Sequence, residues 1–226
     1  MTDKRVNHAL IMAAGRGLRM KPLTDKIPKA MAPHGESTLI ANGIKKLESC
    51  FKNIYITVGY KGAMLASHVI EQNVSAVFNT EGKGNAWWLY NTLIKTINEP
   101  IFVLTCDNIL EMNFDLFLDD YFKQGSPACM IIPVKPVPGI EGDYIIKDQN
   151  NVVEKFDRKN PTDLYCSGIQ IINPLKINEF TDSKEDFSEV WHQLIDINQL
   201  LCSNLVPDKW YSVDSLEQLE EINKSI

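Results

Sequence analysis

The sequence has few cysteines, no long apolar run and no excess of positive charge. Its five cysteines are scattered without a Cys-x-x-Cys pair, which suits neither a disulfide framework nor a structural zinc site. It contains no apolar run of about 20 residues and no signal-peptide core, so we expect a cytoplasmic protein with no membrane partner. Its 23 Lys and Arg against 29 Asp and Glu give a net charge of −6, which argues against nucleic acid as a partner.

Short apolar runs alternate with amphipathic stretches through the first half of the chain. Runs closed by turn residues predict buried parallel strands at 8–14, 54–59, 76–79 and 101–105. Apolar positions at helical spacing predict helices at 38–50, 62–72 and 85–97. The alternation predicts an α/β fold with a doubly wound, mostly parallel sheet flanked by helices, which binds ligands at the carboxyl ends of its strands.

The second half changes to shorter extended pieces after a predicted helix at 114–122. Strands are predicted at 129–134, 143–147, 152–156, 165–173 and 210–213, and a helix at 187–201. Ser215 and Gln218 have the spacing of a capping box, which predicts the start of a last helix. We interpret the extended pieces as a small mixed-strand extension of one sheet. Without a long linker or a repeat, residues 1–226 are expected to form a single domain.

Glycines and basic residues follow the first predicted strand. Gly15 and Gly17 would let backbone N–H groups approach an anion closely, because no Cβ stands in the way. Residues 1–29 hold seven basic and two acidic side chains, a local net charge of +5 in a chain of −6, which favours a multiply charged ligand. A dinucleotide-binding fingerprint would need glycine in place of Met20 and an acidic residue in place of Gly59, and the Walker pattern is also missing.

The same segment carries a more specific pattern. It reads Ala-Ala-Gly-x-Gly-x-Arg at 13–19, Pro-x-Thr at 22–24 and Pro-Lys at 28–29. This combination resembles the nucleotidylyltransferases that activate sugar phosphates, choline phosphate and similar metabolites with a nucleoside triphosphate. The resemblance implies a Rossmann-like nucleotidyltransferase fold, with Arg19 on the β- and γ-phosphates, Lys29 on the α-phosphate and Lys155 as a third catalytic residue. The implied nucleotide-binding residues are Ala13, Ala14, Gly15, Gly17, Arg19, Asn79, Gly84 and Asn85.

Joining a triphosphate to a phosphorylated acceptor brings two polyanions together, and a divalent cation neutralises them best. Asp107 closes a predicted buried strand and Asp214 ends a short one. The resemblance implies that both aspartates bind Mg²⁺. It also implies that the acceptor is bound by Lys83, Glu154, Lys155 and Gly168. Phe156 follows Lys155 where sugar-activating members usually have proline.

The segment 79–88 bears on the choice of nucleotide. An asparagine and small residues before Trp87 and Trp88 resemble the cytidylyltransferases for choline phosphate more than the sugar enzymes, which points to CTP. The two tryptophans are expected in the core rather than stacked on the base. Among small single-domain members, the resemblance extends to the cytidylyltransferases of capsule polysaccharide synthesis that act on L-glutamine phosphate. Phosphocholine is the second expected acceptor, after L-glutamine phosphate.

The sequence is also compatible with other functions. The chain could be a sugar-1-phosphate guanylyl- or uridylyltransferase, or a non-catalytic nucleotide-sensing module. A glycosyltransferase usually carries Asp-x-Asp, whereas Asn108 and Ile109 follow Asp107 here. The sequence leaves a homodimer open.

Overall fold

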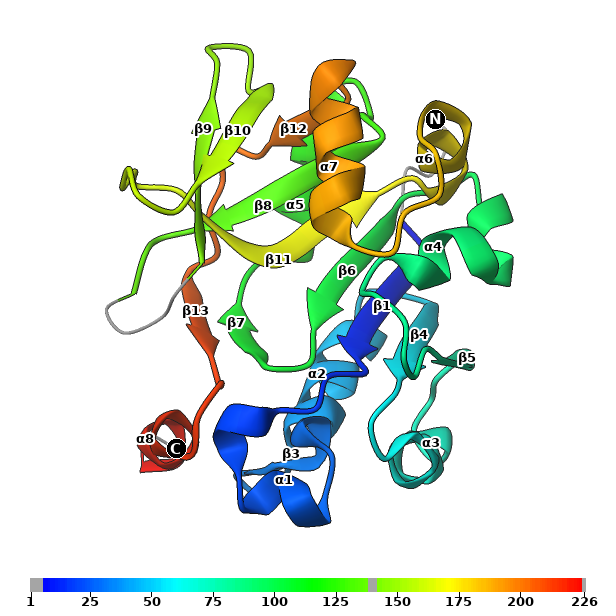
Figure 1. The fold of residues 1–226 in the computed structure, drawn as a ribbon, viewed down its shortest axis with the longest axis vertical. Helices are drawn as coiled ribbons and strands as arrows, with labels where there is room; N and C mark the ends of the chain where they lie inside the picture. Colours follow the sequence, from blue (N-terminus) through cyan, green and yellow to red (C-terminus); the bar gives the residue numbers. More distant parts are fainter. Residues whose placement is uncertain (1–5, 138–141, 225–226) are drawn as a thin grey trace. The chain divides into compact units, whose positions relative to one another are not determined.

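The computed structural model of the protein describes residues 6–137 and 142–224 (Figure 1). Lys4 and Arg5, two of the basic residues counted near the N-terminus, lie outside the described residues. The chain folds as two compact units whose segments alternate along the sequence. Unit 1 holds Gly84–Val103 and Leu110–Trp210 with the N-terminal residues, and unit 2 holds His8–Lys83, Leu104–Ile109 and Tyr211–Ile226. The single domain stays a prediction.

Unit 2 is built on three parallel strands, β1 (His8–Ala13), β4 (Asn53–Val58) and β5 (Ala76–Asn79). β4 pairs with both of the others, and its last residue is opposite Ala13 on one side and Asn79 on the other. The carboxyl ends of the three strands therefore lie at the same edge of the sheet. Helices α2 (Leu39–Glu48) and α3 (Gly62–Ile70) connect the strands, which confirms the predicted α/β class.

Shorter elements follow β1 in unit 2. They are η1 (Leu18–Met20), α1 (Leu23–Lys26), η2 (Lys29–Met31), β2 (Pro33–His34) and β3 (Ser37–Thr38). The last helix, α8 (Leu216–Lys224), begins at the predicted position. Met20, Leu39, Val213 and Leu219 form one buried apolar cluster. This cluster holds the C-terminal segment against the turns that follow β1.

Three strands contribute residues to both units: β6 (Ile101–Thr105), β7 (Asn108–Glu111) and β13 (Lys209–Ser212). Within unit 2, the Cys106 amide donates to the Met12 carbonyl at 3.0 Å, which places the end of β6 beside β1. The residues that follow β6 therefore emerge at the same edge as the turns after β1.

Unit 1 contains the mixed strands that the sequence predicts. Its strands are β8 (Cys129–Val134), β9 (Asp143–Lys147), β10 (Val153–Asp157), β11 (Tyr165–Ile172) and β12 (Leu200–Cys202). Its helices are α4 (Trp87–Asn91), η3 (Leu93–Thr96), α5 (Phe114–Lys123), α6 (Pro174–Phe180) and α7 (Phe187–Asp196). β11 runs antiparallel to β6, β8 and β9. Its register shifts between Cys166 and Gln170, where Gly168 has a φ of 80° that suits glycine.

Two predicted helices of unit 1 are shorter in the structure. The helix expected at 85–97 breaks at Thr92, whose hydroxyl donates to the Trp88 carbonyl and accepts from the Ile94 amide. Leu93, one of the apolar positions at helical spacing in that predicted helix, is 82% exposed. The helix expected to reach residue 201 ends at Asp196, because Leu200 pairs with β8 in β12.

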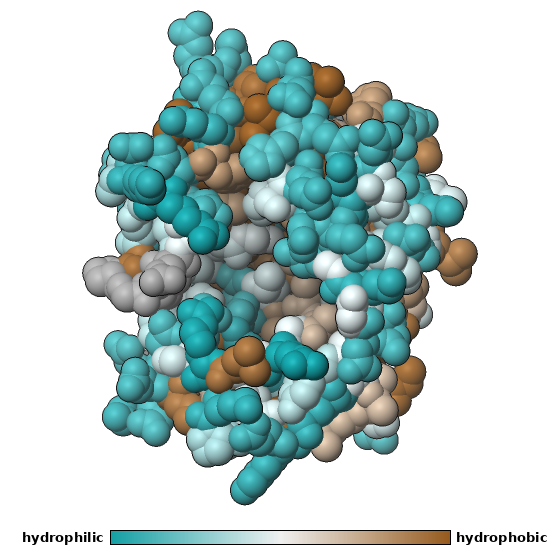
Figure 2. Space-filling view, in the orientation of Figure 1, coloured by the Kyte–Doolittle hydropathy of each residue, from teal (hydrophilic) through white to brown (hydrophobic). Residues whose placement is uncertain are grey.

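The face of the molecule seen in Figure 2 is mainly hydrophilic, with hydrophobic residues in small separate groups. Within 6–137 and 142–224, none of the helices combines the length and apolar character that a membrane crossing needs.

Gly59, which follows β4, shows how tightly the carboxyl ends of the unit 2 strands are packed. A Cβ there would lie 2.7 Å from the Ala14 carbonyl oxygen, whereas a Cβ on Gly43 in α2 would make an ordinary contact, 3.4 Å from Ile11. We expect Gly59→Ala to lower the free energy of unfolding by about 1–3 kcal/mol through overpacking. The matched Gly43→Ala should be neutral or stabilising by up to about 1 kcal/mol, since alanine favours a helix interior. Urea unfolding measures both, and a Gly59→Ala protein as stable as wild type would contradict the packing argument.

Candidate active site

The turn after β1 is held in place by a chain of hydrogen bonds. Gly17 has a left-handed backbone with a φ of 59°, and a Cβ on it would lie 2.8 Å from the Cβ of Lys29. The Thr24 hydroxyl donates to the Gly17 carbonyl at 2.9 Å, and the Tyr60 hydroxyl donates to the Thr24 carbonyl at 3.0 Å. The glycine turn therefore packs directly against the stem of Lys29.

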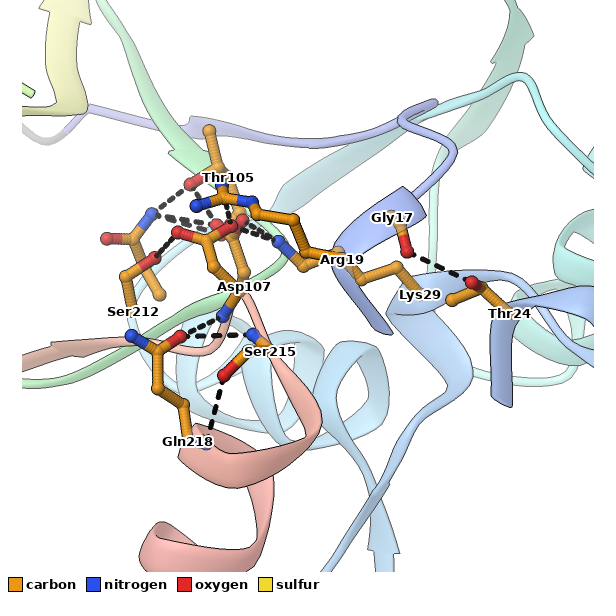
Figure 3. A network of polar contacts seen from close by, with 11 residues as sticks. Gly17, Arg19, Thr24, Lys29, Thr105, Asp107, Ser212, Ser215 and Gln218 are labelled. Atoms are coloured by element: carbon orange, nitrogen blue, oxygen red, sulfur yellow. Dashed lines mark hydrogen bonds and ion pairs between the residues drawn. The ribbon is translucent and has the colours of Figure 1, made fainter. Parts of the chain in front are cut away.

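Lys29 opens η2 after Pro28, and its side chain is only 9% exposed. Its Nζ lies 2.5 Å from Asp107 Oδ2 and 2.8 Å from Asp214 Oδ1, so one ammonium group joins the two predicted metal aspartates (Figure 3). Burial by itself lowers the pKa of Lys29, but the charge of Asp107 and the hydrogen bonds to both carboxylates raise it above its ordinary value. Lys29 is therefore a cation at neutral pH.

Asp107 is positioned by its neighbours at the end of β6. The Thr105 hydroxyl donates to Asp107 Oδ1 at 2.6 Å, and the Asn108 amide group donates to the same hydroxyl. The Val213 amide donates to the Asp107 carbonyl at 3.0 Å. This backbone contact places Asp214, the next residue, beside Asp107.

Asp214 is fixed by the predicted capping box, which the structure confirms. Gln218 Oε1 accepts from the amides of Asp214 and Ser215 at 2.7 and 3.0 Å, and the Gln218 amide donates to the Ser215 hydroxyl. The Ser212 hydroxyl donates to Asp214 Oδ2 at 3.3 Å. Partial burial raises the pKa of Asp214, but the hydrogen bond and charge of Lys29 outweigh it and hold this pKa below its ordinary value.

Arg19 adds a second cation, with Nη2 2.9 Å from Asp214 Oδ1. Its side chain is 67% exposed, unlike that of Lys29. Figure 3 shows the side chains of Arg19 and Lys29 reaching toward Asp107. The predicted residues Arg19, Lys29, Asp107 and Asp214 are thus in contact within unit 2.

Ala13 and Ala14, also predicted to bind nucleotide, join the end of β1 to β4. The Ala13 amide donates to the Thr57 hydroxyl at 3.2 Å, and the Ala14 carbonyl accepts from the Tyr60 amide at 3.1 Å. Gly15 follows, is exposed, and has no atom within 4 Å of an added Cβ. The space beside Gly15 is open to a ligand.

The cluster suits a divalent ion better than covalent catalysis. Two carboxylates already hold one shared cation, and Mg²⁺ commonly takes one or two carboxylates and completes its shell with water and substrate phosphates. Within the described ranges there is no group of three or more His, Cys, Asp or Glu that could hold a metal, so such an ion would depend on phosphate oxygens. Burial raises the pKa of the Cys106 thiol to about 12, so this neighbour of Asp107 stays protonated and a poor nucleophile.

The residues predicted to read the base fall in both units. Asn79 is exposed at the end of β5 in unit 2, and its Oδ1 accepts from the Glu81 amide at 3.0 Å. In unit 1, Asn85 Oδ1 accepts from the Phe187 amide at 2.8 Å, at the start of α7, and the Gly84 amide donates to Glu185 at 2.9 Å. Their contact with a base stays a prediction. Lys83, predicted for the acceptor, is exposed in unit 2.

Trp88, by contrast, is 1% exposed, as expected of a core residue, and Trp87 is half-buried.

The remaining acceptor residues lie in unit 1. Glu154 and Lys155 are exposed where the register of β10 shifts against β9, and a bulge of this kind redirects side chains. Lys155 Nζ lies 3.4 Å from Asp157, whose pKa is lowered to about 2, chiefly by a hydrogen bond from Asn160. Gly168 is on β11, with β9 between it and β10 in the sheet. Their joint action on an acceptor stays a prediction.

Sequence reasoning missed Tyr60 and the hydroxyls of Thr105 and Ser212. The two hydroxyls occur at the same spacing, two residues before Asp107 and Asp214, and each donates to its aspartate. The repeated hydroxyl-x-Asp spacing was the signal that could have found them. Tyr60 lies two residues after the end of β4, so its place near the carboxyl end of a strand was also visible in the sequence.

Gly17 and Gly15 provide a matched test of the glycine turn. Gly17→Ala should lower the free energy of unfolding by about 1–2 kcal/mol, because alanine is strained in the left-handed region and its Cβ would meet Lys29. Gly15→Ala should leave stability within about 0.5 kcal/mol but weaken nucleotide binding, since its Cβ would occupy the open space at the turn. Urea unfolding and nucleotide titration separate the two effects. Equal losses of stability in both variants would contradict this assignment.

Comparison with known proteins finds relatives of this chain. Curated relatives include the bifunctional protein GlmU of Methanococcus aeolicus, 29% identical over 168 residues, and the mannose-1-phosphate guanyltransferase of Pichia angusta, 29% identical over 184 residues. The alignments cover 71% and 75% of this chain but 39% and 50% of those relatives. The chain therefore spans half or less of their length.

Solved structures of similar fold cover the chain almost completely. A putative glucose-1-phosphate thymidylyltransferase of Bacillus anthracis has a TM-score of 0.79 at 18% identity, covering 96% of this chain and 94% of its own. The CTP:phosphocholine cytidylyltransferase of Streptococcus pneumoniae has a TM-score of 0.73 at 23% identity, covering 96% and 98%. Because residues 8–226 also match the family described as nucleotidyl transferase, this chain belongs to the nucleotidyl transferase family.

Proposed function

We propose that this protein transfers a nucleotidyl group from a nucleoside triphosphate to the phosphate of a small acceptor and releases pyrophosphate. The observation that carries the proposal is the contact of Lys29 with both Asp107 and Asp214, beside the glycine turn and Arg19. The cluster supplies cations for phosphate oxygens and two carboxylates for a divalent ion. Family membership supports the same reaction class.

In this reaction an acceptor phosphate oxygen attacks the α-phosphorus and forms the new P–O bond. The bond from the α-phosphorus to the bridging oxygen of the β-phosphate breaks, and that oxygen leaves with pyrophosphate. A phosphate monoester such as phosphocholine has a second pKa of about 6, so at neutral pH this acceptor is mostly a dianion and needs no general base. Lys29 would hold the α-phosphate and Arg19 the β- and γ-phosphates, so catalysis consists of positioning and charge stabilisation.

Asp107 and Asp214 would hold Mg²⁺. When bound, the ion would neutralise charge on the triphosphate and on the leaving pyrophosphate. Thr105 and Ser212 keep the two carboxylates oriented through their hydrogen bonds.

The proposed donor is CTP and the first acceptor is L-glutamine phosphate, with phosphocholine second. The residues of segment 79–88 support CTP, and two structures of similar fold are a CTP:phosphocholine cytidylyltransferase and an inositol-1-phosphate CTP transferase of T. maritima. Glu154, Lys155 and Gly168, with Lys83, are proposed to hold the acceptor.

A second candidate is a sugar-1-phosphate guanylyl- or uridylyltransferase. The observation that favours it is the identity of 29% with the mannose-1-phosphate guanyltransferase of Pichia angusta. A non-catalytic nucleotide-sensing module is the third candidate, and turnover of any nucleoside triphosphate would exclude it.

The reaction class is tested by pyrophosphate release from Lys29→Ala and Asp107→Asn proteins. Each should lose at least about hundredfold in rate, the usual effect of removing a charge-stabilising group. Lys45→Ala, exposed on α2, and Asp25→Asn, more than half exposed, are the matched controls and should keep wild-type activity. If both site variants stay within about threefold of wild type, roughly 0.7 kcal/mol, the assigned roles are wrong.

The substrates are tested by incubating the protein with each of the four triphosphates and a panel of phosphorylated acceptors. The panel contains L-glutamine phosphate, phosphocholine, mannose 1-phosphate and glucose 1-phosphate, with mass spectrometry of the products. A cytidylyl product on one of the first two acceptors is expected. A guanylyl or uridylyl sugar instead would replace the CTP proposal by the second candidate.

A further inference from the structure

In the free protein, the proposed metal ligands and the proposed phosphate-binding cations neutralise each other. All four carboxylate oxygens of Asp107 and Asp214 accept from the protein. Asp107 accepts a hydrogen bond from the Thr105 hydroxyl on Oδ1 and one from Lys29 Nζ on Oδ2. Asp214 Oδ1 contacts the cationic groups of Lys29 and Arg19, and its Oδ2 accepts a hydrogen bond from the Ser212 hydroxyl. One oxygen of each carboxylate is therefore bonded to a cationic group, and a divalent ion at the two carboxylates would be repelled by these cations until they move away.

Lys29 and Arg19 differ in how easily they can leave. Arg19 is 67% exposed, so water can solvate its guanidinium when it turns away from Asp214. Lys29 is 9% exposed, and its stem packs on Gly17, so its ammonium cannot move into bulk water without losing this packing. A buried charge needs another partner of opposite sign before it gives up the first. The triphosphate proposed to bind at the glycine turn is such a partner.

We infer that the ammonium group of Lys29 is the resident counter-ion of Asp107 and Asp214 and makes these carboxylates available to a divalent ion only when nucleotide binds. This inference rests on the proposed function, because it assigns Lys29 an anionic ligand at the turn. Lys29 thereby couples the two binding events. Metal affinity should be low in the free protein and rise with nucleotide, and by linkage nucleotide affinity should rise with metal by the same factor.

The coupling is tested by titrating the full chain with Mn²⁺, with free Mn²⁺ measured by electron paramagnetic resonance. Without nucleotide, Lys29→Met should bind Mn²⁺ at least about tenfold more tightly than wild type, because the repulsion between the ammonium group and the divalent ion is gone. Lys29→Arg should stay close to wild type, since it keeps the charge. Lys45→Met, which removes an exposed cation on α2, is the control for net charge and should also match wild type.

In the double variant Lys29→Met with Asp107→Asn, the gain in Mn²⁺ affinity should disappear, because one of the two carboxylates is lost. After subtraction of the Mn²⁺ that CTP binds without protein, CTP should tighten Mn²⁺ binding to wild type at least about tenfold more than it tightens binding to Lys29→Met. Lys29→Met binding Mn²⁺ no more tightly than wild type would overturn the inference. If Lys29→Met does not fold by itself, Mn²⁺ should restore its folding by pairing the two carboxylates, and failure to do so would equally overturn it.

The result of the Mn²⁺ titration is independent of whether the protein forms a nucleotidyl product. Mn²⁺ binding to Lys29→Met without nucleotide needs no turnover, so a gain there supports the counter-ion role even if no nucleotidyl product forms. Turnover by wild type without that gain would leave the proposed function standing and remove the coupling.

Discussion

The bond of one buried ammonium group to two carboxylates is the interaction on which the candidate site depends. Lys29, Asp107 and Asp214 come from three separate parts of the chain, and each is attached to a different local element. A cation with so little exposure is costly unless it is paired, and two neighbouring carboxylates repel each other unless a cation lies between them. The three charges therefore require each other, and the surrounding backbone must keep them within hydrogen-bonding distance.

Several features of unit 2 serve that requirement. The left-handed turn at Gly17 lets the backbone pack on the Lys29 stem, and the Tyr60 and Thr24 hydroxyls keep this turn in place. On the other side, Gln218 caps the segment at Asp214, and the apolar cluster around α8 anchors it. The fold positions charged groups through neutral hydrogen bonds and packing, which do not compete with a charged ligand.

The names of a curated relative and of solved structures with a similar fold include different nucleotides and acceptors. This variety agrees with a site whose shared chemistry is the handling of phosphate charge. In the proposed function, the cations and carboxylates act on the triphosphate and do not distinguish one base from another. Selection of nucleotide and acceptor must come from other side chains, for which we propose Asn79 and Asn85 on the base side and Lys155 on the acceptor side.

The sequence by itself determined the local features of this protein. Strand and helix periodicity, the glycine turn and the capping box of Ser215 and Gln218 depend on residues a few positions apart, so their spacing was enough to predict them. Only the tertiary structure decided that Lys29 bonds carboxylates 78 and 185 positions away, and that the chain after Asp196 forms β12 instead of more helix. Such contacts depend on strand order, register and competition between distant partners, which local spacing does not encode.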